Sequence, residues 1–200
     1  MAKIIGLHGK MHTGKSAIAK ILKQKDPNGI VVRSFAGKLR EVLGILNIPE
    51  HRDSMQKLGQ GLRDVYPEVW VNAVRRDVEK DLHSGYTVIF DDVRYPNEFD
   101  YIRGEKGLLI KLYAEDDVRW ERYKTSPKFD PSIPSSVARQ MWEEKQRHVS
   151  ELMLDDLDLR WNLEVNTNNL SRRDMNGVAE ALAISIQAMR NVNGRRNLDC

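Results

Sequence analysis

Residues 3–16 read KIIGLHGKMHTGKS, a short apolar run that passes directly into a glycine-rich loop. The loop from Gly9 to Ser16 matches the pattern G-x-x-x-x-G-K-[ST] at every fixed position. Its glycines let the backbone bend until successive N–H groups face inward, where they bind the oxygens of a polyphosphate. The residues around the loop predict a strand over 3–8 and a helix over 16–25. That is the context in which this motif binds phosphate.

The loop predicts an ATP site in which each position has a defined role. The Lys15 ammonium is expected to reach the β- and γ-phosphates, and the Ser16 hydroxyl to ligate Mg²⁺. The N-terminus of the following helix adds the positive end of its dipole. A lone histidine in such a loop more often packs or contributes only its backbone, so His8 and His12 receive no catalytic role. The predicted ATP-binding residues are Gly9, His12, Thr13, Gly14, Lys15, Ser16 and Ala17.

Apolar segments beyond the loop predict alternating strands and helices around a parallel sheet. The predicted class is α/β, a three-layer α/β/α P-loop fold with a central, mainly parallel five-stranded sheet. The further strands are expected at 30–35, 86–90, 108–113 and 161–166. Apolar stripes at helical spacing, assigned to the core, are Val71, Val74, Val78 and Leu82, and Val178, Leu182 and Ile186.

The composition suits one intracellular domain spanning 1–200. Two hundred residues with 40% hydrophobic content are enough to bury one core. The net charge of +3 gives no argument for nucleic acid, and no apolar run approaches the ~20 residues of a membrane span. The apolar stretch at 4–7 is too short for a secretory signal. The single cysteine, Cys200, excludes an intrachain disulfide and fits the cytoplasm.

The strand predicted at 86–90 runs into Asp91, Asp92 and Arg94. Ligands of an open parallel sheet gather at the carboxyl ends of its strands. P-loop enzymes place a carboxylate there to organise Mg²⁺, so either Asp91 or Asp92 is expected to do so. The alternative is that both aspartates cap the helix after Pro96, although Asn97 and Glu98 can serve that helix start.

Residues 114–156 depart from the strand–helix pattern. They are dense in charge, and their middle, SPKFDPSIPSS, predicts irregular structure. A long insertion of this kind is usually a functional lid or a disordered segment. We expect a helical lid that closes over the transferring phosphate. Its candidate phosphate-binding side chains, for each of which solvated surface is an equal alternative, are Arg119, Arg122, Arg139 and Arg147.

Several segments together resemble one family. The sequence DDVRYPNE at 91–98 resembles the D-V-R-[FY]-P-N-E segment of the deoxynucleoside monophosphate kinases encoded by bacteriophages. The same holds for MQKLGQGLR at 55–63 followed by PEVWV at 67–71. FAGKLR at 35–40 and HVSE at 148–151 extend the resemblance, which runs from residue 3 to about residue 170.

The resemblance implies an adenylate-kinase-like fold that transfers the γ-phosphate of ATP, with Mg²⁺, to a deoxynucleoside monophosphate (dNMP). The products would be ADP and a dNDP, a DNA precursor. It implies an acceptor-binding region at about 36–75 and a homodimer, since many such enzymes are dimers. The acceptor-binding residues that it implies are Lys38, Arg63, Trp70, Asp92 and Arg94. The residues implied in the transfer itself are Lys15, Asp92, Arg94, Arg119 and Arg122.

The alternatives are a kinase of another small acceptor and a P-loop switch or motor. A kinase of another small acceptor, such as dephospho-coenzyme A, would use the same loop, although the LG…R…W and DVRYPNE segments argue against it. A GTPase should carry an N-K-x-D segment, which the sequence lacks. A motor normally shows an acidic pair ending in glutamate, where this chain has Asp91 and Asp92. Which bases are accepted depends on pocket shape, which the sequence does not reveal.

Overall fold

A five-stranded parallel sheet forms the centre of the molecule. The computed structural model describes residues 3–154 and 157–196, so Cys200 lies outside the described residues. Within them the strand order is β2-β3-β1-β4-β5, and all neighbouring strands pair in parallel. This confirms the predicted α/β class. The strands are β1 (Ile4–His8), β2 (Ile30–Arg33), β3 (Thr87–Val93), β4 (Leu108–Tyr113) and β5 (Leu163–Asn166).

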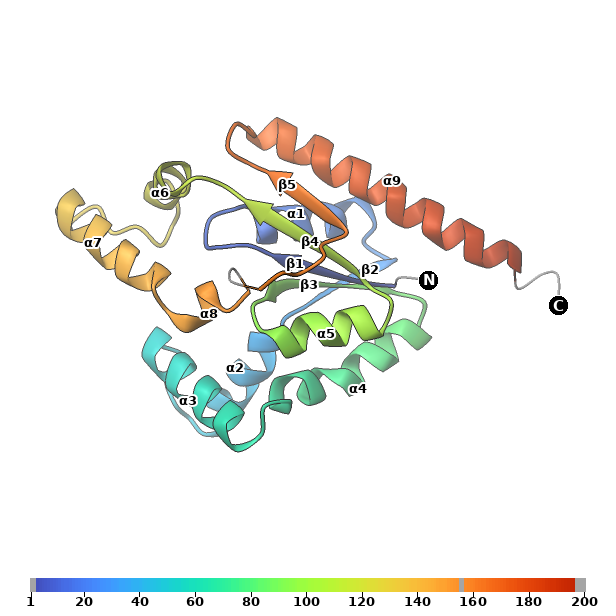
Figure 1. Ribbon diagram of the computed structural model, residues 1–200, viewed down its shortest axis with the longest axis horizontal. Coiled ribbons are helices and arrows are strands. Elements are labelled where there is room, and N and C mark those ends of the chain that lie inside the picture. The colour runs from blue at the N-terminus through green and yellow to red at the C-terminus, as the bar shows by residue number, and fades with distance from the viewer. Residues whose placement is uncertain (1–2, 155–156, 197–200) are drawn as a thin grey trace.

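Helices cover both faces of the sheet and complete the three predicted layers (Figure 1). One face carries α1 (Lys15–Lys25) and α9 (Arg172–Arg196), and the other carries α4 (Val69–His83) and α5 (Pro96–Gly104). The remaining helices are α2 (Phe35–Ile45), α3 (Arg52–Val65), α6 (Asp116–Lys124), α7 (Ser135–Gln146) and α8 (Val149–Leu152). None of the helices in the described part of the chain has both the length and the apolar composition of a membrane span.

Side chains that alternate along the strands form two apolar layers. Ile5 and Leu7 of β1 pack with Leu22 of α1 and Ala179 of α9. On the opposite face, Ile4 belongs to the layer that α4 and α5 cover. Both layers are buried from solvent, so the sheet is fixed from two sides.

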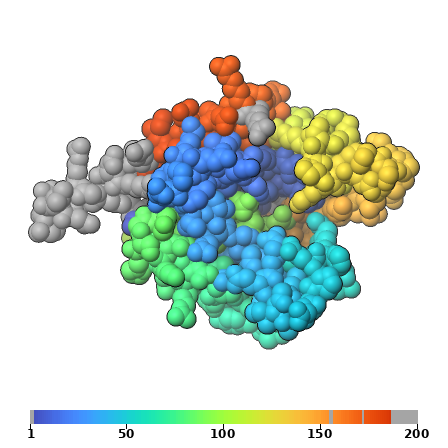
Figure 2. Space-filling view, turned by 180° about the vertical axis from the view of Figure 1, so that it is seen from behind, coloured from blue at the N-terminus to red at the C-terminus, as the bar shows by residue number. Residues whose placement is uncertain are grey.

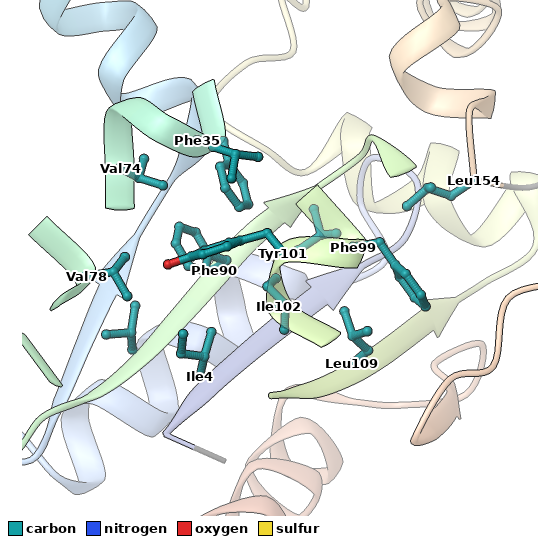
Figure 3. Packing of buried hydrophobic residues seen from close by; sticks show 13 residues of the cluster. Ile4, Phe35, Val74, Val78, Phe90, Phe99, Tyr101, Ile102, Leu109 and Leu154 are labelled. Atoms are coloured by element: carbon teal, nitrogen blue, oxygen red, sulfur yellow. The ribbon is translucent and has the colours of Figure 1, made fainter. Parts of the chain in front are cut away.

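The layer beneath α4 and α5 is rich in aromatic rings (Figure 3). The Phe35 and Phe90 rings stack with their centroids 4.3 Å apart, and Tyr101 meets Phe90 edge-on at 6.5 Å. Val74 and Val78 of the predicted α4 stripe pack into the same layer, which confirms that this stripe belongs to the core.

Two strands end at other residues than predicted, because helix capping or strand pairing sets where they end. β2 ends at Arg33, because the Ser34 side chain accepts a hydrogen bond from Gly37 N and starts α2 there. β3 continues through both aspartates to Val93, because it stays paired with β1 as far as His8. Residues 126–134 are irregular, as predicted, and α7 begins at Ser135.

The helices α6 and α7 share a small apolar core of their own. Trp120 and Trp142 are buried there with their ring centroids 5.7 Å apart, and Tyr123 and Phe129 pack against them. The Arg139 guanidinium lies over both indoles, at 5.3 and 5.0 Å from the ring centroids. Between β4 and β5 the chain therefore forms a packed helical unit and not an extended loop.

We predict that Ile102→Ala lowers the free energy of unfolding by about 3 kcal/mol, because a fully buried side chain leaves a cavity in the layer beneath α5. Urea denaturation measures this loss. The matched control is Ile45→Ala, whose side chain is 78% exposed at the end of α2; it should change stability by less than about 0.5 kcal/mol. Equal losses for both variants would contradict the assignment of Ile102 to the core.

Candidate active site

The phosphate-binding loop between β1 and α1 has a backbone that only glycine can adopt at two points. Gly9 has a φ of 145°, and a Cβ there would lie 2.2 Å from the Leu112 carbonyl oxygen. Gly14, with a φ of 99°, is the left-handed residue from which α1 starts. The fixed glycines of the motif are thus required by backbone geometry.

The N-terminus of α1 has features that favour an anion. In the described structure no side chain caps this helix, and the first-turn N–H groups of any helix lack intrahelical acceptors. Ser16 and Ala17 of this turn are exposed. Together with the helix dipole, these donors favour a phosphate group. The geometry fits the triphosphate that the motif predicts.

Lys15 is a buried cation whose proton is loosely held. Its Nζ donates to the carbonyl of Gly9 and, at 2.9 Å, to that of Lys10. Burial and then the nearby Arg94 charge lower the Lys15 pKa to about 8, although Glu151 and the strand-end aspartates oppose them.

The pKa of His12, in the same loop, is lowered as well. Burial, followed by the charges of Lys128 and Lys15, lowers the His12 pKa to about 4. The ring is therefore uncharged at neutral pH and adds no cation to the loop.

Asp92 caps α2 and not the helix after Pro96. Its carboxylate accepts hydrogen bonds from Ser34 Oγ at 2.6 Å and from the N–H groups of Phe35 and Ala36 at 3.1 and 2.9 Å. Burial raises its pKa, and the Ser34 bond works against that rise. At the start of α5 the cap is Glu98, which accepts from the N–H groups of Arg94 and Tyr95.

The Asp91 carboxylate and the Ser16 hydroxyl, predicted to organise magnesium, are both oxygen donors. The pairing of β3 with β1 shifts register between Phe90 and Val93, so the two aspartates stand at an irregular end of the strand. No hydrogen bond from another described residue engages the Asp91 carboxylate or the Ser16 hydroxyl. Hard oxygen donors of this kind suit Mg²⁺, which keeps several water molecules when bound.

A cavity of roughly 50 Å³ lies beside Asp92 and gathers most of the predicted acceptor residues. Arg63, Trp70 and Arg94 line it together with Asp92. Lys38 does not: its ammonium pairs with Asp77 of α4 at 2.7 Å and with Glu41 at 2.8 Å. Hydrogen bonds to those two carboxylates raise the Lys38 pKa.

The Arg63 guanidinium is held on several sides at the wall of this cavity. It lies 3.6 Å from the centroid of the Tyr95 ring, pairs with Glu98 at 3.3 Å, and donates to the Gly59 carbonyl at 3.2 Å. Trp70 Nε1 donates to the same carbonyl at 3.0 Å. Burial raises the pKa of Glu98 to about 7.

A second, larger cavity of about 350 Å³ lies between α3 and the end of α7. Arg52 and Gln56 line it from α3, opposite Lys145 and Arg147. Because Arg52, Gln56, Gly59 and Arg63 follow one another at helical spacing, a single face of α3 borders both cavities. Figure 2 shows α3, in cyan, and the helices α6 and α7, in yellow to orange, projecting on the same side of the molecule.

Two of the predicted lid arginines contact the phosphate-binding loop. Arg119 donates to the Met11 carbonyl at 3.3 Å and to Gln146 Oε1 at 2.6 Å, and its side chain is 1% exposed. Its Nε is buried without an acceptor among the described residues. Arg122 donates to the His12 carbonyl at 3.2 Å. By contrast, Arg139 packs within the α6–α7 unit and Arg147 borders the larger cavity.

Several residues of the site were not selected by sequence reasoning. Tyr95 and Glu98 could have been, because they stand within four residues of Arg94 in the DVRYPNE segment. Thr167 carries no sequence signal, yet it is fully buried and its hydroxyl lies 3.1 Å from the Thr13 carbonyl. Glu151 accepts hydrogen bonds from Arg94 and from the Met11 N–H.

A comparison with protein families finds one whose description is the AAA domain. Its model matches residues 5–151, which is more than half of the 200 residues. The match includes the phosphate-binding loop, both aspartates and Glu151. No curated protein matches the chain.

Several solved structures resemble the chain in fold. A presumed kinase from Chloroflexus aurantiacus has a TM-score of 0.58 at 16% identity, over 94% of this chain and 97% of that one. Shikimate kinase from Bacteroides thetaiotaomicron has a TM-score of 0.52 at 12% identity, over 92% and 98%. A sugar kinase from Janibacter sp. HTCC2649 has a TM-score of 0.50 at 13% identity, over 90% and 92%. At such identities the likeness extends to the fold alone.

We predict that the affinity for Mg-ATP weakens as the pH rises through the Lys15 pKa of about 8. Below that pH the ammonium is present before binding; above it, binding must first take up a proton, which costs up to about tenfold per pH unit. Calorimetric titration between pH 7 and 9.5 measures the effect. Lys15→Ala should bind weakly with a flat profile, and a wild-type profile that is equally flat would contradict the prediction.

Proposed function

This chain belongs to the AAA domain family, and we propose that it is an ATP-dependent kinase of a small molecule, with a deoxynucleoside monophosphate as acceptor. One observation carries the proposal: a phosphate-binding loop and a cavity with two arginines meet at the same end of the sheet. In the reaction an acceptor phosphate oxygen attacks the γ-phosphorus, the bond to the β–γ bridging oxygen breaks, and ADP leaves with the electron pair. The acceptor oxygen is already anionic, so no general base is required.

On the donor side, Lys15 and the N–H groups at the start of α1 would bind the β- and γ-phosphates. Mg²⁺, when bound, neutralises charge on the phosphate oxygens. Ser16 would ligate it directly. Of the two aspartates, Asp91 is the better candidate to hold its water ligands, because Asp92 is engaged in capping α2.

On the acceptor side, Arg63 and Arg94 would bind the monophosphate, since a guanidinium can contact two of its oxygens at once. Trp70 would form the apolar wall of this pocket. The larger cavity along the same face of α3 offers room for the nucleoside. A contact from Lys38 stays a prediction, and it would require the ammonium to leave Asp77. The acceptor-binding region would thus be about 36–75.

Residues 114–156 would be the lid, of which Asp155 and Asp156 lie outside the described residues. Because α6 and α7 share a core, the lid would move as one body on its connections. On closure, Arg119 and Arg122 would give up their hydrogen bonds to loop carbonyls and donate to oxygens of the transferring phosphate. Such a contact would also give Arg119 Nε the acceptor that it lacks. Closure would exclude water and so prevent hydrolysis of ATP. A cytoplasmic location and a homodimer stay predictions.

The acceptor is tested by the release of ADP with and without each dNMP, with shikimate and simple sugars as competing acceptors. We expect release to depend on a dNMP. Arg63→Ala should raise KM for the dNMP at least about tenfold while KM for ATP changes little, because a charge-assisted contact to phosphate is lost. Arg63→Lys should recover part of the loss, since a point charge cannot make the two-oxygen contact.

The matched control for Arg63 is Arg75→Ala. Arg75 of α4 also lies over a tyrosine, Tyr101, and pairs with a glutamate, Glu105, but it lines neither cavity. Its replacement should leave both KM values unchanged. Equal rises in both KM values for Arg63→Ala would assign that arginine to structure or to the donor side. Transfer to a sugar in place of a dNMP would overturn the proposed acceptor.

We further predict that trypsin cuts the free protein after the exposed Lys128, in the irregular stretch between α6 and α7. An analogue that joins ATP and dNMP through their phosphates should slow this cut at least about tenfold, because it stabilises the closed state. ATP alone should slow it much less. Cleavage after Lys106, exposed in the turn between α5 and β4, provides the internal control. Equal rates at Lys128 with and without the analogue would exclude lid closure.

A further inference from the structure

The carboxylate of Glu151 joins two parts of the site that are distant in sequence. One oxygen, Oε1, accepts a hydrogen bond from Arg94 Nη1, and the other, Oε2, accepts from the Met11 N–H at 3.2 Å. The side chain is 1% exposed. A charge so fully desolvated is tolerated only when it is paired and hydrogen-bonded, as this one is. Glu151 thereby connects the end of β3 to the phosphate-binding loop.

Local structure fixes the place of this carboxylate. His148 caps the one-turn helix α8 by accepting from Ser150 N at 3.2 Å, and Glu151 N donates to the His148 carbonyl at 2.8 Å. Three residues later, Leu154 is buried in the layer beneath α4 and α5 (Figure 3). Glu151 therefore stands at the point where the chain returns from the α6–α7 unit to the core.

The charge of Glu151 offsets a repulsion between two buried cations. Arg94 lowers the pKa of Lys15, whereas Glu151 raises it. Burial lowers the pKa of Arg94, whereas the charge and hydrogen bond of Glu151 and the charges of Asp92 and Glu98 together raise it. Glu151 is thus a counter-charge that both cations share.

Arg94 is also held at its backbone. Its N–H donates to Glu98 Oε2 at 2.8 Å, and its side chain lines the acceptor cavity. Glu98 thus fixes the main chain of Arg94 and Glu151 fixes its guanidinium. Arg94 is thereby oriented between the cavity beside Asp92 and the loop. Misplacement of such a group by about 1 Å can cost a hundredfold in rate.

We propose that Glu151 is a positioning residue, which rests on the proposed function: it holds Arg94 against the phosphate-binding loop so that the donor and acceptor phosphates meet in line. It touches neither substrate and acts through Arg94. Its loss should therefore affect the transfer step more than the binding of ATP.

Glu151→Gln tests this proposal, because glutamine keeps the size and an oxygen for Met11 N but removes the charge that orients Arg94. We expect kcat to fall at least about tenfold while KM for ATP stays within about threefold. Glu151→Asp retains the charge on a shorter side chain and should recover part of kcat. It also provides a second variant in case Glu151→Gln does not fold. The control is Glu164→Gln, an exposed carboxylate on β5, which should behave as wild type.

A double-mutant cycle separates positioning from a general structural effect. Since Glu151 acts through Arg94, Glu151→Gln combined with Arg94→Ala should have the kcat of Arg94→Ala alone. If the two losses multiply, the proposal is wrong. It is also overturned if Glu151→Gln keeps the wild-type kcat, or binds ATP more tightly without losing kcat. The latter result would make the carboxylate a competitor of phosphate.

Amide hydrogen exchange at Met11 tests whether Glu151 holds the loop, and it requires no phosphate-accepting substrate. Exchange at this N–H should be at least about tenfold faster in Glu151→Ala than in wild type or Glu164→Gln. Unchanged exchange would show that Glu151 does not hold the loop. A wild-type protein that phosphorylates no nucleotide would contradict the proposed function alone, and the exchange result would still decide whether this connection exists.

Discussion

The parallel pairing of β1 with β3 is the constraint on which the rest of the site depends. Gly6 lies opposite Phe90, and His8 lies opposite Val93, so the register brings the end of β3 beside the start of the phosphate-binding loop. Asp91, Asp92 and Arg94 reach Lys15 only because of this register. This pairing includes a register shift at the two aspartates, and a different register would place both carboxylates elsewhere. It would remove the hydrogen bonds of Asp92 to the start of α2, and with them one wall of the cavity beside Asp92.

Charge around the loop is balanced before any ligand binds. The cations Lys15 and Arg94 face the carboxylates of Asp91, Asp92 and Glu151. Each buried group therefore has a counter-charge, which keeps the cost of desolvation low. A polyphosphate adds negative charge at this place, so its binding would favour the protonated form of Lys15. Proton uptake and phosphate binding are thereby linked through a single side chain.

Sequence patterns within one segment predicted the features that depend on that segment alone. The apolar runs located each strand of the described residues, and the contiguous loop motif predicted the glycine-dependent turn from Gly9 to Ser16. Contacts between distant segments could not be predicted in this way. Met11 and Glu151 are 140 residues apart, and neither segment contains a signal for the other. The ion pair of Lys38 with Asp77 likewise depends on how α2 packs on α4, which no spacing within either helix encodes.

The cations that would bind phosphate are occupied by carbonyl oxygens of the loop itself. Lys15 donates to Gly9 and Lys10, and Arg119 and Arg122 donate to Met11 and His12. Phosphate binding must therefore replace these contacts, and the net gain is the difference between a charged and a neutral acceptor. The arginines belong to α6 and the lysine to α1. Replacement of the carbonyl contacts by phosphate would therefore link the α6–α7 unit to the ligand. A ligand that engages only Lys15 leaves the contacts of both arginines intact. One that presents charge to all three cations would favour a rearranged position of α6. In the proposed kinase, occupation of both substrate sites and movement of this unit would therefore be thermodynamically coupled.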